Sequence, residues 1–442
     1  MNGGAVRIGC GAGFSADRLD GAVDLARDGR LDALVFECVG ERTLAFGHRD
    51  RKLDPAKGFN PQLEARLKAV WPLCIAGGCT IVTNMGVANP RRAAEVAMAL
   101  GVDGGRAAAV LGDDVTALIG PETPLDGGRL TVADVGRELL GANAYLGTDA
   151  LLPALQAGVS LVIGGRIADP ALFLSVLRHR FGWAADDWPL LGAGTLVGHL
   201  LECGTQVTGG YFADPGHKEV PGLARVGYPL AEVAADGTFE LTKLADTGGM
   251  VTAATVKEQL LYEVHDPARY LTPDVTADFS GVQLDDRGGD VVALSGAGGA
   301  ARPETLKVTV AFDGGFLAEG EVSYAGRGAA GRARLAGEVT EERLRRVHGF
   351  TEDLRLDLIG VQSLHRHHDH GVAPEGTDVR LRVAGRFRER ERAETLLWEV
   401  ESLLCCGPAG GGGFRGRVTP SVVTHDAFLP RSDVPTRVEV FG

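Results

Sequence analysis

The first 180 residues alternate short apolar runs with segments of helical periodicity, and this alternation is the strongest constraint on the fold. Helical stretches such as 90–101 and 148–158 separate the runs, and several end in the glycine expected just beyond a helix C-terminus. The runs are continuously apolar, which is typical of strands in a parallel sheet covered on both faces. The candidate strands are 5–11, 32–38, 79–86, 106–113, 143–147 and 159–165.

The pattern changes near residue 220. Segments 237–252 and 304–324 alternate polar and apolar residues between glycine-rich turns, which predicts antiparallel or mixed strands. We therefore expect an α/β domain over 1–220, with a mostly parallel open sheet and helices on both faces, and a mixed α+β domain over 221–442. A TIM-like barrel is the alternative for the first domain, but only six βα units are recognisable, which favours the open sheet.

Charge and hydropathy exclude several classes of partner. The 442-residue chain has a formal charge of −13, which argues against a nucleic-acid or anionic-membrane partner. No apolar run approaches the length of a membrane span and no signal peptide is recognisable, so we expect a cytoplasmic protein with no membrane partner. The seven cysteines lack regular spacing and are expected to be free thiols. The glycine-rich composition is typical of a bacterial source, and a homo-oligomer is expected for an enzyme of this size.

Polar residues and glycines follow each candidate strand, at the edge where parallel α/β sheets bind ligands. Glu37 and Cys38 follow the second run, Asn84 follows the third, and Arg166 and Asp169 follow the sixth. We expect Glu37 to act as an acid or base, and Asn84 and Arg166 to bind substrate. If Asp169 pairs with Arg166, it orients the guanidinium; a helix cap is the alternative for this aspartate.

The segment LLECGTQVTGG, residues 200–210, places a carboxylate, a thiol, an amide and a glycine pair in one short stretch. Glu202 is a candidate acid or base, and Gln206 with the amides of Gly209 and Gly210 is a candidate for holding a carbonyl oxygen. Cys203 is a candidate nucleophile, with a small buried residue as the alternative. No neighbouring histidine is assigned to Cys203, so the carboxylate is the better candidate for chemistry.

The segment GAGFSA, residues 11–16, matches a dinucleotide-binding fingerprint between a strand and a helix, and Glu37 stands where such sites place an acid. In this interpretation Gly11, Gly13 and Ser15 approach a pyrophosphate, and NAD(P) is the cofactor. Because the chain contains 64 glycines, a short match also arises by chance, and Ser15 as a helix N-cap is the alternative.

Two further segments are candidate ligand sites. In GPAGGGGF, residues 407–414, the backbone of Gly410, Gly411 and Gly412 is a candidate anion nest, with a flexible helix C-cap as the alternative. The run LHRHHDHG, residues 364–371, holds four histidines and an aspartate, but ligands so crowded seldom reach one ion with good geometry. We therefore interpret the His365–His370 cluster as a surface loop and predict no metal site.

Seven long motifs resemble the family named for acyclic terpene utilisation protein A, formerly a domain of unknown function. They run over nearly the whole chain: IGCGAGFSADRLDGAVDLA, LVFECVGERTLA, IVTNMGVANP, VIGGRIADPAL, LLECGTQVTGGYFAD, TGGMVTAATVKEQLLYEVHDPARYLTPDV and GPAGGGG. Longer relatives carry an additional C-terminal ferredoxin-like domain, which we expect this chain, ending at Gly442, to lack.

The resemblance implies a role in a bacterial pathway that degrades citronellol and geraniol through CoA thioesters, in which geranyl-CoA is carboxylated, hydrated and cleaved. It implies a hydratase or lyase acting on a branched or terpenoid acyl-CoA, in catabolism or in a biosynthetic cluster. The family supplies no catalytic residues to carry over, so Glu37 and Glu202 are the candidate base and acid on the reasoning above. Two alternatives stay open: an NAD(P)-dependent oxidoreductase that uses GAGFSA and Glu37, and a non-catalytic subunit that works with a small partner chain in an acyl-CoA-processing complex.

Overall fold

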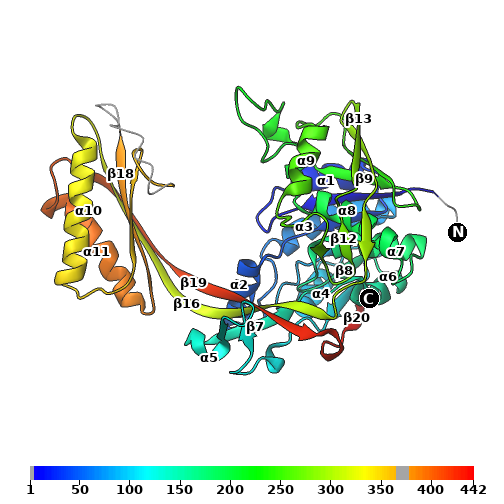
Figure 1. Cartoon of the computed structure of the whole chain (residues 1–442), viewed down its shortest axis with the longest axis horizontal. Helices are drawn as coiled ribbons and strands as arrows, with labels where there is room; N and C mark the ends of the chain where they lie inside the picture. The colour runs from blue at the N-terminus through cyan, green and yellow to red at the C-terminus, as the bar shows by residue number, and fades with distance from the viewer. Residues whose placement is uncertain (1–3, 365–377) are drawn as a thin grey trace. The chain divides into compact units, whose positions relative to one another are not determined.

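The computed structural model describes residues 4–364 and 378–442. The chain forms two compact units: a larger one that extends to Ala311 and includes Thr424–Gly442, and a smaller one, Phe312–Val423 (Figure 1). The boundaries between these units differ from the boundary that was expected near residue 220. The reason is that the strands just after residue 220 pair with the sheet of the first 200 residues and so belong to the same body.

A ten-stranded sheet forms the larger unit, and its order is β13-β14-β10-β9-β1-β2-β3-β8-β4-β20. Its five central strands are parallel: β1 (Val6–Ala12), β2 (Ala33–Phe36), β3 (Thr80–Thr83), β8 (Leu161–Ile163) and β4 (Ala107–Leu111). The flanking strands are antiparallel: β9 (Pro229–Val233), β10 (Phe239–Lys243), β14 (Val291–Ser295), β13 (Gln283–Gly288) and β20 (Arg437–Phe441).

The predicted α/β class with a mostly parallel core is confirmed, and no closed barrel is detected in the described part of the chain. Five of the six candidate strands form the parallel centre. The prediction for 143–147 was wrong, because the strand there, β7 (Leu139–Ala144), pairs with β16 (Thr305–Tyr324) outside this sheet. An isolated apolar run cannot show which of two sheets it will join.

Helices cover both faces of the large sheet. On one face α1 (Asp20–Asp28), α3 (Leu63–Gly77) and α4 (Pro90–Ala99) bury side chains in one hydrophobic cluster with the central strands. The helices α6 (Thr148–Gln156), α7 (Asp169–Phe181) and α8 (Trp188–Glu202) contact the same sheet but contribute no side chain to that cluster, so they cover the opposite face. This arrangement agrees with right-handed crossovers. The chain moves in one direction across the sheet from β1 through β2 and β3 to β4, and it moves in the opposite direction from β4 to β8, so the connecting helices lie on opposite faces.

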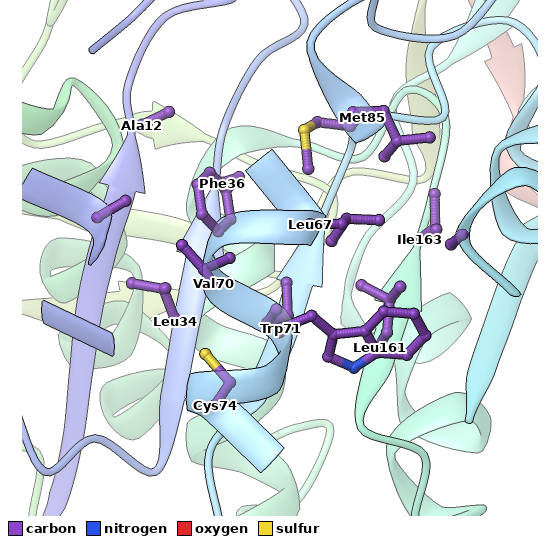
Figure 2. Close-up of a cluster of buried hydrophobic side chains, with 14 of the residues drawn as sticks. Ala12, Leu34, Phe36, Leu67, Val70, Trp71, Cys74, Met85, Leu161 and Ile163 are labelled. Atoms are coloured by element: carbon purple, nitrogen blue, oxygen red, sulfur yellow. The ribbon is translucent and has the colours of Figure 1, made fainter. Parts of the chain in front are cut away.

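Helix α3 supplies the largest side chain of the core. Val70, Trp71 and Cys74 recur at the spacing of one helical face and are fully buried against Phe36 and Leu161 of the sheet (Figure 2). The indole N–H of Trp71 donates a hydrogen bond of 3.0 Å to a serine hydroxyl before β8. The packing of this face fixes the strand ends from which the functional loops begin.

The smaller unit has the element order βαββαβ, and its sheet order is β17-β18-β16-β19. Its elements are the distal part of β16, α10 (Ala329–Arg346), β17 (Leu354–Ile359), β18 (Val379–Phe387), α11 (Arg390–Cys406) and the first part of β19 (Gly412–Pro430). Both helices contact β18 and each other (Figure 1). This is a ferredoxin-like arrangement, and it lies within the chain and not as an appended C-terminal domain.

Short elements complete the described part of the chain. The helices are α2 (Glu41–Leu53), α5 (Val132–Val135) and α9 (Ala253–Leu261); the strands are β5 (Pro124–Leu125), β6 (Leu130–Thr131), β11 (Tyr270–Leu271), β12 (Thr276–Asp278) and β15 (Gly298–Ala300). All seven cysteines are free thiols, as predicted. Among the described helices, none has the length and apolar content needed to cross a membrane.

We expect Trp71→Ala to destabilise the larger unit by about 3–5 kcal/mol, because it removes a fully buried side chain from a packed sheet face. The control is Leu53→Ala, because Leu53 belongs to the same unit and is 71% exposed. Guanidinium unfolding followed by far-ultraviolet circular dichroism measures both. Equal losses for the two variants would contradict the role given to this core.

Candidate functional site

The carboxyl ends of β1, β2 and β8 border a cavity of about 1070 Å³. Its walls include residues of 13–17, 37–43 and 166–170, which follow these three strands, and residues of 202–211 and 303–307. Every lining residue belongs to the larger unit. The cavity therefore lies at the edge of the parallel sheet where the sequence pattern places a ligand.

Glu37 lines this cavity directly after β2. Its Oε1 accepts hydrogen bonds from the backbone N–H of Val39 at 2.8 Å and from Nδ2 of Asn84 at 2.9 Å. Asn84 is fully buried, and its Oδ1 accepts the backbone N–H of Cys38 at 2.7 Å. Asn84 was predicted to hold a substrate carbonyl. In the structure, both the oxygen and the nitrogen of its side-chain amide form hydrogen bonds with the Glu37–Cys38 segment.

Burial is the main reason why Glu37 is an unusually weak acid. Removal from water, together with the negative charge of Asp169, raises the pKa of Glu37 to about 8, against the lowering effects of Arg166 and Asn84. A carboxyl group with such a pKa exchanges a proton near neutral pH. Glu37 is thus suited to proton transfer in the way the sequence analysis expected.

Arg166 lies beneath the cavity after β8 and is almost fully buried. Its Nη1 donates to the carbonyl oxygen of Val39 at 2.6 Å and pairs with Oδ1 of Asp169 at 2.7 Å. The guanidinium also stacks on the ring of Tyr145, 3.9 Å from its centroid. Asp169 therefore pairs with Arg166, and Nη1 of Arg166 donates its hydrogen bonds to oxygen atoms of the protein.

Glu202 is the last residue of α8 and also lines the cavity. Its Oε1 lies 3.2 Å from Nδ1 of His199, one helical turn earlier, and its Oε2 is buried without a hydrogen-bond partner. Burial raises the pKa of Glu202 well above its ordinary value, and the charges of Asp169 and Glu263 raise it further. A second cavity carboxyl group is thus held in conditions that favour its protonated form.

The two cysteines beside these acids are poor nucleophiles in the cavity as it stands. Burial raises the pKa of Cys38 to about 12, despite the Arg66 guanidinium whose Nη1 lies 2.9 Å from its Sγ. Burial and the nearby Glu202 also raise the pKa of Cys203. Because the thiolate is the reactive form, Cys203 has no support here as a nucleophile, and the alternative of a small packed residue fits better.

The glycine pair after α8 does not form the expected oxyanion hole. Gly209 donates its N–H to the carbonyl oxygen of Gln206 at 3.1 Å, and Gly210 donates to that of Thr205 at 2.7 Å. These amides close the turn that follows the helix, so they are not available to a substrate carbonyl. The Gln206 side chain does line the cavity, as does Gly210, whereas Gly209 is not among the lining residues.

The glycines of GAGFSA have packing roles. A Cβ on Gly13 would lie 2.2 Å from the carbonyl carbon of Cys203, and a Cβ on Gly11 would lie 2.7 Å from the ring of Phe36. The following helix begins only at Asp20 with Leu19 as its N-cap, so Ser15 is not a cap. Gly13 and Ser15 line the cavity, but the tight strand-to-helix turn of a dinucleotide fingerprint is not present.

Other predicted ligand segments are not among the residues that line this cavity, or they fall outside the described residues. Gly410, Gly411 and Gly412 belong to the smaller unit, where they follow the end of α11 at Cys406 and lead into β19, and Arg332 donates to the carbonyl oxygen of the preceding Ala409 at 2.7 Å. The His365–His370 cluster lies outside the described residues. Within 4–364 and 378–442, no group of three or more His, Cys, Asp or Glu side chains is arranged to bind a metal ion.

The sequence analysis missed a second polar cluster in the cavity. Tyr145 donates its O–H to Oε1 of Glu41 at 2.6 Å, and Nζ of Lys307 lies 3.4 Å from the same oxygen. Burial opposes ionisation of Glu41, but the Tyr145 hydrogen bond and the charges of Arg166 and Lys307 outweigh it and lower the pKa of Glu41 to about 2. Lys307 comes from β16, and no local pattern indicates that this strand reaches the cavity.

His199 was also missed, although a signal was present. It stands three residues before Glu202 in α8, a spacing that puts both side chains on one face. A neighbouring histidine was considered only for Cys203 and not for the carboxylate. Pairing histidine with Glu202 by helical periodicity would have found it.

Large apolar side chains surround the cavity mouth. Phe14, Tyr211, Leu271 and Phe428 all line the cavity, and each is more than half exposed. Exposed aromatic and aliphatic groups gathered at a concave site are unusual on a protein surface and mark a place for an apolar ligand or partner. The cavity therefore combines a buried acidic floor with an apolar entrance.

The fold and cavity define an α/β protein with a buried acid–base cluster at the carboxyl ends of a parallel sheet. The chain belongs to the acyclic terpene utilisation family: the family model described as acyclic terpene utilisation family protein AtuA matches residues 6–440. This membership suggests a role in acyclic terpene utilisation. The comparisons found no matching curated protein and no matching solved structure.

Replacing Glu37 with glutamine should change how stability depends on pH. Since folding raises the pKa of Glu37 from 4.5 to about 8, the unfolded chain loses this proton first, and wild-type stability falls as pH rises through that interval. Glu37→Gln has no proton to lose and can still accept the two hydrogen bonds. Its melting temperature relative to wild type should therefore rise between pH 4.5 and about 8; a constant difference would contradict the raised pKa.

Gly13→Ala should destabilise the larger unit by about 1–3 kcal/mol or more, because the added Cβ meets the immovable backbone of Cys203. Gly40→Ala is the control, since Gly40 also lines the cavity but has no heavy atom within 4 Å of its Cβ position. Thermal unfolding compares the two. If both variants melt alike, the packing role given to Gly13 is wrong.

Proposed function

We propose that this protein is an enzyme that adds water to, removes water from, or cleaves by a retro-aldol step a branched or terpenoid acyl-CoA thioester. The observation that carries the proposal is the pair of buried carboxyl groups, Glu37 and Glu202, in one cavity with raised pKa values. Family membership supports the terpenoid context. The proposed reaction at this site is the same whether the pathway degrades or builds the acyl chain.

These reactions need one group that accepts a proton and another that donates one. In hydration, a base takes a proton from water as its oxygen bonds to the β-carbon, and an acid protonates the α-carbon of the resulting enolate. In retro-aldol cleavage, the base takes the proton of the β-hydroxyl group and the acid protonates the departing enolate. Two carboxyl groups on one cavity floor can serve either sequence.

The walls of the cavity suit the other parts of such a substrate. The rim formed by Phe14, Tyr211, Leu271 and Phe428 would cover an apolar acyl chain. Arg42 also lines the cavity, is exposed, and makes no ion pair in the described residues, so it is placed to meet a CoA phosphate. Gln206 also lines the cavity, and its side-chain amide is a candidate donor to the thioester oxygen.

An NAD(P)-dependent oxidoreductase is less well supported. Its two defining glycines, Gly11 and Gly13, pack against protein atoms, and Oε1 of Glu37 already accepts hydrogen bonds from Val39 and Asn84. A non-catalytic subunit requires the same cavity to bind ligand without converting it. The experiment below separates all three functions.

Purified protein should convert a branched 2-enoyl-CoA to a product heavier by one water, or cleave the matching 3-hydroxyacyl-CoA, as measured by mass spectrometry of the thioesters. Glu37→Gln and Glu202→Gln should each lower turnover by about 10²–10⁴-fold, the usual contribution of a general acid or base. Glu64→Gln, at an exposed glutamate of α3, is the control and should retain full activity.

Thermal-shift measurements on the same samples test the alternatives. Stabilisation by NAD(P) and not by CoA thioesters would overturn the proposal in favour of an oxidoreductase. Stabilisation by acyl-CoA with no turnover, alone or in the presence of a partner chain, would identify a binding subunit.

A further inference from the structure

The two carboxyl groups of the cavity, Glu37 and Glu202, have different hydrogen-bonding surroundings. This difference indicates which of the two carries a proton. The decisive neighbour is His199, which is 1% exposed and packs against the rings of Tyr270 and Phe279, with centroid distances of 5.2 and 5.7 Å. Neither ring nitrogen of His199 reaches water, so each must be satisfied by the protein.

The tautomer of His199 follows from its backbone partner. Its Nε2 lies 3.2 Å from the carbonyl oxygen of Leu260, which can only accept a hydrogen bond, so Nε2 carries the hydrogen. Burial lowers the pKa of His199 to about 4, so the ring is neutral near pH 7. A neutral imidazole protonated at Nε2 presents a lone pair at Nδ1.

Glu202 faces that lone pair. Its Oε1 lies 3.2 Å from Nδ1 of His199, and its Oε2 has no partner. An ionised Glu202 would thus place an acceptor against an acceptor while buried, which costs several kcal/mol. A protonated Glu202 instead donates its O–H to Nδ1 and satisfies both residues.

The charged and titratable groups around Glu202 favour the same state. From other elements the carboxyl group meets Asp169, Glu263 and Tyr270, and only Arg166 lowers its pKa. Cys203 and Glu37 also interact with this group of charges. The acids near Glu202 therefore outnumber its one cationic neighbour, whose Nη1 is already paired with Asp169.

Glu37 is surrounded by donors. The N–H of Val39 and Nδ2 of Asn84 both donate to its Oε1, and these hydrogen bonds lower the pKa of Glu37 and so favour its carboxylate form.

We infer that Glu202 holds a proton against Nδ1 of His199 and acts as the acid, that Glu37 acts as the base, and that His199 is the positioning residue that fixes this division. The catalytic meaning of the division rests on the proposed function. In hydration, Glu37 gains the proton of water as the C–O bond forms, the electron pair moves to the thioester enolate, and Glu202 protonates the α-carbon. Proton return from Glu37 to Glu202 through solvent restores the starting state, and the lone pair of His199 favours that return.

Infrared spectroscopy of the full-length protein without substrate tests the assignment. At about pH 9, where most ordinary carboxyl groups and Glu37 are ionised, we expect a protonated-carboxyl band that disappears in Glu202→Gln and persists in Glu37→Gln. Nitrogen-15 NMR of histidine-labelled protein should show His199 protonated at Nε2 and bare at Nδ1. Absence of the band, its persistence in Glu202→Gln, or an Nδ1–H tautomer would overturn the inference.

Variants of His199 separate positioning from packing. His199→Asn keeps an acceptor near the place of Nδ1 and should retain the hydrogen-bonded band, whereas His199→Leu keeps bulk without an acceptor and should shift the band to that of a free carboxylic acid. An identical band in wild type and His199→Leu would show that His199 does not bind the proton. Because no substrate is used, a protein with this band and no turnover on acyl-CoA would refute the proposed function alone.

Discussion

The guanidinium of Arg166 is the interaction on which the cavity depends. It joins the loop after β2, through the carbonyl oxygen of Val39, to the start of α7, through Asp169, and it stacks on Tyr145. Its backbone N–H also binds Oδ2 of Asp113, at the end of β4. One buried cation therefore ties together loops from separate strands, and a chain without it would leave Asp169 and the carbonyl oxygen of Val39 without this partner.

The same cation opposes the effect of burial on the acids of the cavity floor, because it lowers the pKa values of Glu37 and Glu202. Glu37, Asp169 and Glu202 share the field of Arg166, whose closest carboxylate partner is Asp169. Since water is largely excluded, the remaining carboxyl groups are stabilised by protons in place of counter-ions. The raised pKa values follow first from removing these carboxyl groups from water and then from the charges of the neighbouring acids.

Local sequence patterns predicted much of this arrangement. Continuous apolar runs identified the five parallel strands, and the rule that ligands bind at their carboxyl ends predicted that Glu37, Arg166 and Asp169 lie at one edge of the sheet. The residues that the sequence reasoning misassigned have roles set by contacts across the chain. Asn84 supports Glu37 from a neighbouring strand, and Gly13 faces the backbone of Cys203, 190 positions away in the printed sequence.

The sequence by itself determined the α/β class, the strand ends, the free cysteines and the acid pair, because each depends on hydrophobic periodicity or on residue type at a strand end or helix end. Only the tertiary structure decided that the strands after residue 220 extend the first sheet, that Lys307 reaches the cavity, and that Glu202 meets a lone pair of His199. These features depend on which distant backbone oxygen or charge lies opposite a given group. Burial and hydrogen-bond direction are properties of the folded chain, and no local pattern carries them.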